Sequence, residues 1–458
     1  MKRSLTLIAF LLLLPSFQEV SSAQEKPTAD QPVSATLQDL FSHLEKHDQF
    51  MGSVTVLKDG NVVFNQAFGQ RGLTAAGEPV LADSQTSYGI GSITKMFTSV
   101  LINQMVDAGQ ISLDDKLSKF FPDVVHADQI TIDQLLRHRS GLKNITATPD
   151  YPAWSRQPQT RQAMLERIEK LPADFPAGEK TEYSNTNFLL LGYLVEKISA
   201  QPFAEVLKEK ITDPLGMTRT FFEPASTIEN NADSFRHINE WIKVPPTDPS
   251  VPHAAGVIVS TSGDLVTFVS GLFAGKLVSQ ASLDRMTDTS GGLGQGLMSF
   301  PFGRKRALGH NGAIDGFRSG LAYFPEDDVV IAICGNGVVY PFNQLMIESL
   351  KRVFAMPAEL PSFASVEVSE KQLRLYEGTY AAENFPLKLT IAVDGDGKLT
   401  GQATGQSAFP LTAKSDTDFR FDAAQIRMEF FESAAGKGYD RIRFQQGPMK
   451  QEFKKQAP

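Results

Sequence analysis

The sequence predicts an α+β fold: one antiparallel sheet flanked by helices, followed by a small C-terminal antiparallel β-barrel. Three observations lead to this prediction. Strand patterns lie at both ends of residues 36–355, helical patterns fill the middle, and alternating apolar patterns return after residue 368. Because an apolar strand face must be covered, the strands at the two ends are expected to form one sheet packed against the helices. The alternation beyond residue 368 is typical of a meander or barrel.

The first predicted elements are a helix and a hairpin. Within residues 35–50, apolar residues from Leu37 to Leu44 recur at helical spacing and predict an amphipathic helix. Two alternating apolar runs follow within residues 52–69, joined by an Asp-Gly pair. Asp-Gly between such runs is a strong signal for a β-hairpin.

Helices are predicted for the middle of the chain, and strands return after them. The expected elements, in order, are helices within residues 131–142, 184–200 and 260–275, strands within 307–337, and a closing helix at 342–354. Ser262 is the expected cap of the third helix, before Asp264. A turn is expected at residues 325–328.

Domain boundaries follow from changes in composition. Around residues 355–366 the chain becomes Pro-rich and loses periodicity, which predicts a linker at 356–367. We therefore expect a first domain at 24–355 and a C-terminal barrel at 368–458. In the barrel, Leu389 and Ile391 belong to one apolar face of a strand.

The N-terminus has the pattern of a cleaved export signal. Two basic residues precede an apolar core at Leu5–Leu14, and small residues at Ser21 and Ala23 suit cleavage before Gln24. The core is too short to span a bilayer comfortably. We therefore expect residues 1–23 to be a signal peptide and the mature protein to be periplasmic or secreted, without a stable membrane span; an uncleaved anchor is the alternative.

The composition of the chain argues against nucleic-acid binding and excludes an internal disulfide. The 458-residue chain is 41% hydrophobic and 21% charged, with a formal net charge of -8. An acidic chain without basic clusters is a poor partner for nucleic acid. Cys334 is the only cysteine, so no disulfide within the chain is possible, and its apolar surroundings predict a buried core thiol.

The stretch "YGIGSITKMFTSVL", residues 88–101, carries the first candidate for catalysis. An apolar helical face follows Ser92, and residues three apart share a face, so the Lys95 amine is expected beside the Ser92 hydroxyl. Serine needs a neighbour to take its proton, and burial at a helix N-terminus lowers the pKa of a lysine enough for this role. The alternative is a serine N-cap with a solvated lysine. A second Ser-x-x-Lys, at Ser140 and Lys143, is interrupted by a glycine.

Two further motifs complete an ordered set. Tyr183-x-Asn185 opens a predicted helix, and His310-x-Gly312 lies on a predicted strand. With Ser92-x-x-Lys95, this order resembles the penicillin-recognising serine hydrolases: class C β-lactamases, D-alanyl-D-alanine carboxypeptidases, related esterases and D-aminopeptidases. The resemblance covers about residues 36–355 and implies a β-lactamase/transpeptidase-like fold with an all-helical subdomain. The C-terminal strands resemble the lipocalin-like domains appended to some of these hydrolases.

The resemblance implies a role for each motif residue. Ser92 would be the nucleophile that forms an acyl-enzyme, Lys95 would hold or take its proton, and Tyr183 would be the second proton carrier. Asn185 would bind a substrate amide. The backbone N–H groups of Ser92 and Ala313 would form the oxyanion hole.

No metal or cofactor is implied. His43 and His47 have the i, i+4 spacing of zinc ligands but lack the His-Glu-x-x-His order, so we interpret them as a polar helix face. His138 is interpreted as structural rather than catalytic.

One motif departs from many β-lactamases, which have Lys-Thr-Gly where this chain has His310, Asn311 and Gly312. These three would bind substrate, with Gly312 letting the strand lie close to it. Because histidine is cationic only part of the time near neutral pH, the departure favours a peptidase or esterase over an efficient β-lactamase. Arg318 is a candidate substitute cation, with a solvated strand arginine as the alternative.

The predicted function is therefore an exported serine hydrolase acting on small-molecule or peptide substrates: D-amino-acid peptides, peptidoglycan fragments, β-lactams or esters. A β-lactamase proper is one alternative, and a non-catalytic binding protein that retains the fold is the other. An oligomer is possible.

Overall fold

The computed structural model describes residues 32–222, 229–238, 240–383, 385–424, 426–433, 438–446 and 449–456. The predicted signal peptide, residues 1–23, lies outside these residues. Within the described part of the chain, no helix is both long and apolar enough to cross a membrane.

A six-stranded antiparallel sheet forms the centre of the N-terminal lobe. Its order is β2-β1-β12-β11-β10-β9. The strands are β1 (Phe50–Lys58), β2 (Asn61–Phe68), β9 (Met298–Phe302), β10 (Lys305–Ile314), β11 (Phe317–Phe324) and β12 (Val329–Val338). Because β1 pairs with β12 along its whole length, segments almost 300 residues apart in the chain share one sheet, as predicted.

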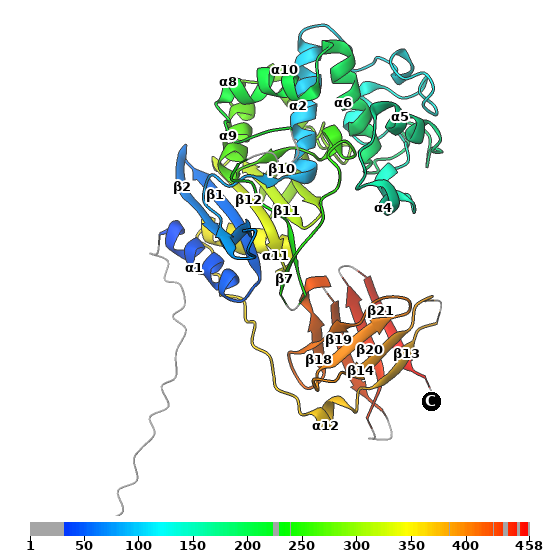
Figure 1. Ribbon diagram of the computed structural model, residues 1–458. Coiled ribbons are helices and arrows are strands. Elements are labelled where there is room, and N and C mark those ends of the chain that lie inside the picture. Colours follow the sequence, from blue (N-terminus) through cyan, green and yellow to red (C-terminus); the bar gives the residue numbers. More distant parts are fainter. Residues whose placement is uncertain are drawn as a thin grey trace, which may run out of the picture.

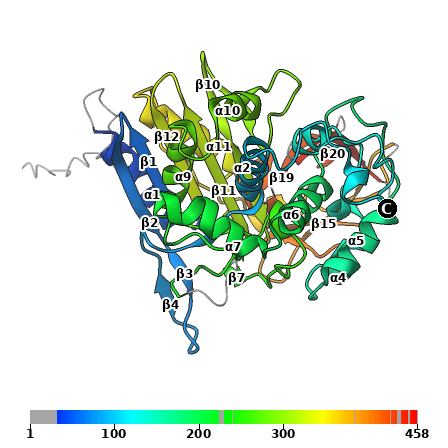
Figure 2. The same cartoon turned by 90° about the horizontal axis from the view of Figure 1, so that it is seen from above.

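Helices cover both faces of this sheet (Figures 1 and 2). On one face, α1 (Val33–Lys46) and α11 (Phe342–Val353) pack side by side. The predicted apolar stripe of α1 from Leu37 to Leu44 is buried there. On the other face, α9 (Ser262–Phe273) packs against β1 and β12, and α2 (Thr94–Asp107) stands above the sheet.

An all-helical subdomain continues from α2, away from the sheet (Figure 1). Its α-helices are α3 (Ile132–Leu136), α4 (Tyr151–Trp154), α5 (Arg161–Glu169), α6 (Asn185–Ser199), α7 (Phe203–Leu207), α8 (Asp213–Leu215) and α10 (Gln280–Thr287). Short 3-10 turns are η1 (Gly91–Ile93), η2 (Leu117–Lys119), η3 (Ile145–Ala147) and η6 (His253–Ala255), and η4 (Lys208–Thr212) is a π-helical turn between α7 and α8. Helix α6 is the centre of this subdomain, because it contacts α2, α3, α7 and η6.

Three small two-stranded sheets complete the N-terminal lobe. They pair β3 (Gln70–Leu73) with β4 (Pro79–Leu81), β5 (Tyr88–Gly89) with β8 (Val259–Ser260), and β6 (Phe235–His237) with β7 (Trp241–Lys243). Strand β5 lies just before Ser92 in the chain, so its pairing with β8 fixes the backbone that leads into Ser92.

Nine antiparallel strands form a nearly closed C-terminal barrel, in the order β16-β15-β14-β13-β21-β20-β19-β18-β17. They are β13 (Gly378–Ala381), β14 (Leu389–Val393), β15 (Leu399–Ala403), β16 (Phe409–Pro410), β17 (Thr412–Ala413), β18 (Asp418–Phe421), β19 (Ile426–Glu432), β20 (Tyr439–Gln446) and β21 (Met449–Lys455). The two end strands, β16 and β17, are separated only by Leu411. The ends of the sheet therefore meet, as a barrel requires.

A linker without regular structure joins the lobe to the barrel, and α12 (Glu370–Leu373) precedes the first barrel strand. The Phe363 ring stacks on His43 of α1 and lies 5.2 Å from the His47 ring. His43 Nε2 also donates to the Pro361 carbonyl, at 2.8 Å. On the other side, the Val366 N–H donates to the Ala413 carbonyl of the barrel. The linker is thus held at both ends.

Two predicted helix boundaries are wrong. The helix expected to run to Gly141 ends at Leu136, because His138 adopts a left-handed conformation with φ 56°. The cap of α9 is Thr261 rather than Ser262, since the Thr261 side chain accepts the Asp264 N–H. The Ser262 hydroxyl instead pairs with that of Thr55 in the core, at 2.8 Å.

Candidate active site

Ser92 lies in the 3-10 turn η1, immediately before α2 begins at Thr94. Its side chain makes no capping hydrogen bond to the helix, so the interpretation of Ser92 as an N-cap is wrong. The preceding Gly91 has φ 51°, a left-handed conformation that glycine adopts without strain. This turn presents the Ser92 hydroxyl at the N-terminal end of a buried helix.

Lys95 is fully buried, so the alternative of a solvated surface lysine is also wrong. Its amine lies 3.1 Å from Ser92 Oγ, 2.7 Å from Asn185 Oδ1 and 2.6 Å from the Ala255 carbonyl oxygen. Burial lowers the pKa of Lys95 well below its usual value, which favours the neutral amine.

The neutral amine can take only one arrangement among these partners. It has two N–H groups and one lone pair, and the oxygens of Asn185 and Ala255 can only accept hydrogen bonds. Both N–H groups are therefore used by those two oxygens, and the lone pair is left for the Ser92 hydroxyl. This geometry suits Lys95 to accept the Ser92 proton.

Tyr183 precedes α6 and covers the Lys95 amine, which lies 4.9 Å from the centroid of its ring. Its buried hydroxyl makes no hydrogen bond among the described residues. Burial raises the pKa of Tyr183, although the nearby Ser92 hydroxyl lowers it in part. The resting side chain is thus a neutral phenol, able to give a proton.

Asn185 is the first residue of α6 and connects Lys95 to the loop before α4. Its Oδ1 accepts from Lys95, and its Nδ2 donates to the Thr146 hydroxyl at 2.8 Å. One N–H of its amide remains for a substrate.

The outer edge of β10 is open where it passes Ser92. Strand β9 pairs with β10 only from Lys305 to Gly309, where Lys305 and Phe302 close a two-residue turn. Because alternate residues of a strand bond to opposite neighbours, the N–H and C=O of Asn311 and Ala313 face the open edge. A Cβ added to Gly91 would lie 2.7 Å from the Ala313 nitrogen, so the Ser92 turn and this edge touch. The arrangement suits an oxyanion hole.

His310 is buried and lies across from Tyr183, with their ring centroids 6.2 Å apart. Its Nδ1 donates to the carbonyl of Asn311, which fixes the tautomer. Burial lowers the pKa of His310 to about 3. The expectation of a partly cationic histidine is therefore wrong: His310 is neutral at physiological pH.

The side chains of Asn311 and Arg318 lie on the face of the sheet opposite to the one that carries the His310 side chain. Asn311 pairs with Gly320, whose added Cβ would meet Phe342 and Met346 of α11 on the opposite face. Arg318, in register with Ala313, shares that face and donates to the Phe317 carbonyl at 2.7 Å. This position favours the alternative interpretation, in which Arg318 is a strand arginine and not a substitute cation for the site.

Gly312 packs against the chain that leads into Ser92. A Cβ at this position would lie 2.0 Å from the Ile90 carbonyl oxygen. The Ser319 hydroxyl donates to the same oxygen at 2.7 Å. Only glycine therefore lets β10 approach the Ser92 turn so closely.

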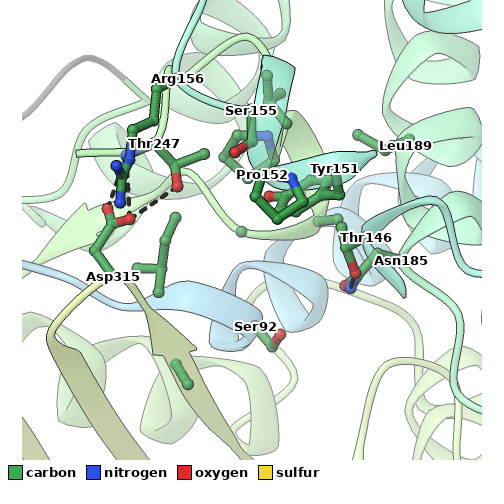
Figure 3. A pocket seen from close by; sticks show the side chains of 16 residues that line it. Ser92, Thr146, Tyr151, Pro152, Ser155, Arg156, Asn185, Leu189, Thr247 and Asp315 are labelled. Carbon is green, nitrogen blue, oxygen red and sulfur yellow. Dashed lines mark hydrogen bonds between the residues drawn. The ribbon is translucent and has the colours of Figure 1, made fainter. Parts of the chain in front are cut away.

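A cavity of about 470 Å³ opens above Ser92 (Figure 3). Asn185, Thr146 and Tyr151 stand on one side of it, with Asp315, Thr247 and Arg156 on the other. The lining residues are Ser92, Thr146, Tyr151, Pro152, Ser155, Arg156, Asn185, Leu189, Thr247, Val251, Pro252, Ala255, Gly256, Ala313, Ile314 and Asp315. Arg156 and Asp315 are the charged members, so the lining carries no net charge.

Several residues of the site carry no signal in the sequence. The Ala255 carbonyl and the Thr146 hydroxyl act through loops that reach Lys95 and Asn185 only after folding. Tyr151 and Arg156 belong to a segment without a motif. Among the described residues, no group of three or more His, Cys, Asp or Glu side chains could hold a metal ion.

Comparison with known proteins agrees with this geometry. A Salmonella agona protein named "Putative D-alanyl-D-alanine carboxypeptidase" is 31% identical over 189 residues, which is 38% of this chain and 43% of the relative. The chain thus spans less than half the length of that relative.

Two solved structures share the fold. The octameric penicillin-binding protein homologue from Pyrococcus abyssi matches 92% of this chain and 99% of its own, with 25% identity and a TM-score of 0.63. A D-stereospecific amidohydrolase from Streptomyces sp. matches 66% of this chain and 94% of its own, with 27% identity and a TM-score of 0.57.

The family model described as Beta-lactamase matches residues 37–351. This range takes in the whole six-stranded sheet, the helical subdomain and every residue of the site around Ser92. The chain therefore belongs to the β-lactamase family.

Proposed function

We propose that this protein is an exported serine hydrolase that forms an acyl-enzyme on Ser92 and cleaves small amides or esters. The observation that carries the proposal is the buried Lys95 amine, whose two acceptor-only partners leave its lone pair for the Ser92 hydroxyl. An unreactive member of the fold has no use for a buried amine in this arrangement, because burial of an ionisable group is costly.

Acylation follows from these positions. Ser92 Oγ attacks the substrate carbonyl carbon while its proton passes to Lys95 Nζ. The carbonyl oxygen, now negative, receives hydrogen bonds from the Ser92 and Ala313 N–H groups. Tyr183 gives its proton to the leaving nitrogen or oxygen and takes one back from Lys95, so the scissile bond breaks and the acyl-enzyme remains. Water then attacks the ester and releases Ser92.

The charges near Ser92 favour substrates without a carboxylate beside the scissile bond. His310 is neutral, and the Asn311 and Arg318 side chains belong to the opposite face of the sheet. Among the described residues, none of these three therefore places a cation where Lys-Thr-Gly enzymes hold the substrate carboxylate. Amides and esters of D-amino acids fit this site better than β-lactams or peptides ending in D-alanine, and a relative of this fold is a D-stereospecific amidohydrolase.

Two further parts of the proposal concern the whole protein. The pattern at residues 1–23 supports export to the periplasm or outside the cell, which predicts a mature chain that begins at Gln24. The Pyrococcus abyssi homologue, which aligns over both domains, is octameric. We therefore propose that this chain also assembles, and light scattering of the purified protein would test it.

Two groups of substrates, without and with a carboxylate, test the proposed activity. D-phenylalanine amide and a p-nitrophenyl ester are compared with D-alanyl-D-alanine and a penicillin, using the wild type and S92A, with intact-protein mass recorded in parallel. We expect Ser92-dependent cleavage of the amide and ester, and much slower reaction with the carboxylates. Efficient penicillin turnover would replace the proposal with a β-lactamase. Cleavage that survives in S92A would exclude the serine mechanism, and no cleavage of any substrate by either protein would favour a binding protein.

A further inference from the structure

His138 holds the chain on both sides of Tyr183. Its carbonyl accepts the Glu182 N–H at 2.9 Å, and its ring Nδ1 accepts the Ser184 N–H at 3.1 Å. The left-handed backbone of His138 lets one residue present both acceptors to the same segment. The backbone before and after Tyr183 is thereby hydrogen-bonded to one residue, His138.

The His138 ring also lies against the phenol. The two ring centroids are 4.4 Å apart with an interplanar angle of 27°. The Lys95 amine lies 4.9 Å from the Tyr183 ring centroid and 5.7 Å from that of Phe188, which itself contacts His138. Tyr183 is therefore packed against both an imidazole and the Lys95 amine.

The contacts assign the tautomer of His138. Because Nδ1 accepts a backbone N–H, the ring proton is on Nε2, a buried atom without a partner among the described residues. Burial lowers the pKa of His138 well below its usual value. Protonation would remove the acceptor for Ser184, so the neutral ring is the form that holds this segment.

We propose that His138 is a positioning residue for Tyr183, which keeps the phenol hydroxyl directed at Ser92 and the leaving group. The inference rests on the proposed function, because it assigns a task to His138 in the same acylation step. His138 is not among the residues that line the cavity above Ser92, so it would act through the segment that carries Tyr183 and not by touching the substrate.

A double-mutant cycle tests this role. H138N keeps an acceptor for Ser184 and tolerates the left-handed backbone but loses the ring. H138A loses both contacts. Each is measured in the wild type and in Y183F, by the acylation burst with a p-nitrophenyl ester. In the wild-type background we expect the burst rate to fall about 10-fold for H138N and about 100-fold for H138A, with the substrate concentration for half-maximal burst rate unchanged, since small misplacement of a reacting group has effects of this order. In Y183F, each should cost about 2-fold or less.

A control variant separates positioning from stability. Ser140 is equally buried and bonds to Asn187 at 2.6 Å, and Asn187 Nδ2 in turn lies 3.4 Å from His138 Nδ1. S140A thus removes a buried hydrogen bond beside His138 but leaves the His138 ring in place, and it should lower the melting temperature without changing the burst rate in either background. Equal losses for H138N in both backgrounds, or no loss in either, would overturn the inference. If Y183F itself left the burst unchanged, the proposed mechanism would fail instead, which keeps the two failures apart.

Discussion

At the scale of single residues, the proposed mechanism makes the reactivity of Ser92 depend on the protonation state of Lys95. The desolvated amine holds its lone pair toward Ser92 only when it is neutral. Burial lowers the pKa of Lys95, so this form is present at a lower pH than in a solvated lysine. The acylation rate should therefore rise with pH and level off well below 10.5.

Replacement of Lys95 by arginine tests this dependence. A guanidinium stays protonated at any pH used, so K95R cannot take the Ser92 proton, and we expect the acylation burst to fall about 10³-fold. Lys143 supplies the control, because it belongs to the second Ser-x-x-Lys and forms an exposed ion pair with Asp174. K143R should acylate like the wild type. Burst activity in K95R near that of K143R would exclude Lys95 as the base.

Gly91 offers a second prediction at this scale. In G91A the new Cβ would lie 2.7 Å from the Ala313 nitrogen, in a residue whose φ is 51°. The left-handed backbone alone costs about 1–2 kcal/mol, and the collision also displaces an oxyanion donor. We expect kcat to fall about 100-fold or more.

Gly60 is the matched control for Gly91. It has φ 71°, and nothing lies within 4 Å of an added Cβ. G60A should lose stability, about 1 kcal/mol in urea unfolding, and keep its activity. Equal kcat losses in G60A and G91A would show that backbone strain, and not contact with Ala313, decides the effect.

Only part of the site could be predicted from the sequence, and the reason is physical. Ser92 and Lys95 are one helical turn apart, so local geometry alone brings them together. The neutral state of His310 and the side of the sheet taken by Asn311 depend on burial and on strand register, which no local pattern encodes. His138 meets Tyr183 across 45 residues of chain, and its left-handed φ is set by that contact rather than by its neighbours.

At the scale of elements, long periodic segments were predictable and short ones were not. Helix α11, expected at 342–354, spans Phe342–Val353. Strand β19 alternates between buried and more exposed residues, as a strand with one apolar face does. The pairs β3–β4 and β6–β7 have strands of three or four residues, too short for a period to show. The end of α3 was misplaced, since the break at His138 comes from tertiary hydrogen bonds and not from the glycine that follows.

The cap of α9 gives a prediction for one element. Thr261 accepts the Asp264 N–H at 3.0 Å, so T261A should destabilise the protein by about 1 kcal/mol in urea unfolding. Thr267 lies on the same helix, is exposed and bonds only back to Gly263. T267A should change stability by less than about 0.5 kcal/mol. Equal effects of the two variants would mean that the cap does not stabilise α9.

At the scale of the whole molecule, the position of the barrel depends on the linker. Phe363 packs against His43 and His47 of α1 and lies edge-on to Tyr340, and the linker backbone then pairs with the barrel at Val366. These contacts lie far along the chain from Ser92, and none of their residues lines the cavity above it. We therefore expect that a change in the position of the barrel leaves the reaction at Ser92 unchanged.

F363A should loosen the barrel without changing the site. Removing an aromatic side chain held by three ring contacts costs about 1–3 kcal/mol of local stability, which favours opening of the linker by about 10- to 100-fold. Limited proteolysis should then cut F363A within residues 356–369 much faster than the wild type, while p-nitrophenyl ester cleavage stays the same. L360A, which alters an exposed linker residue, is the control and should be cut at the wild-type rate. A parallel loss of ester cleavage in F363A would show that the barrel contributes to the site, because the linker would then transmit its position to Ser92.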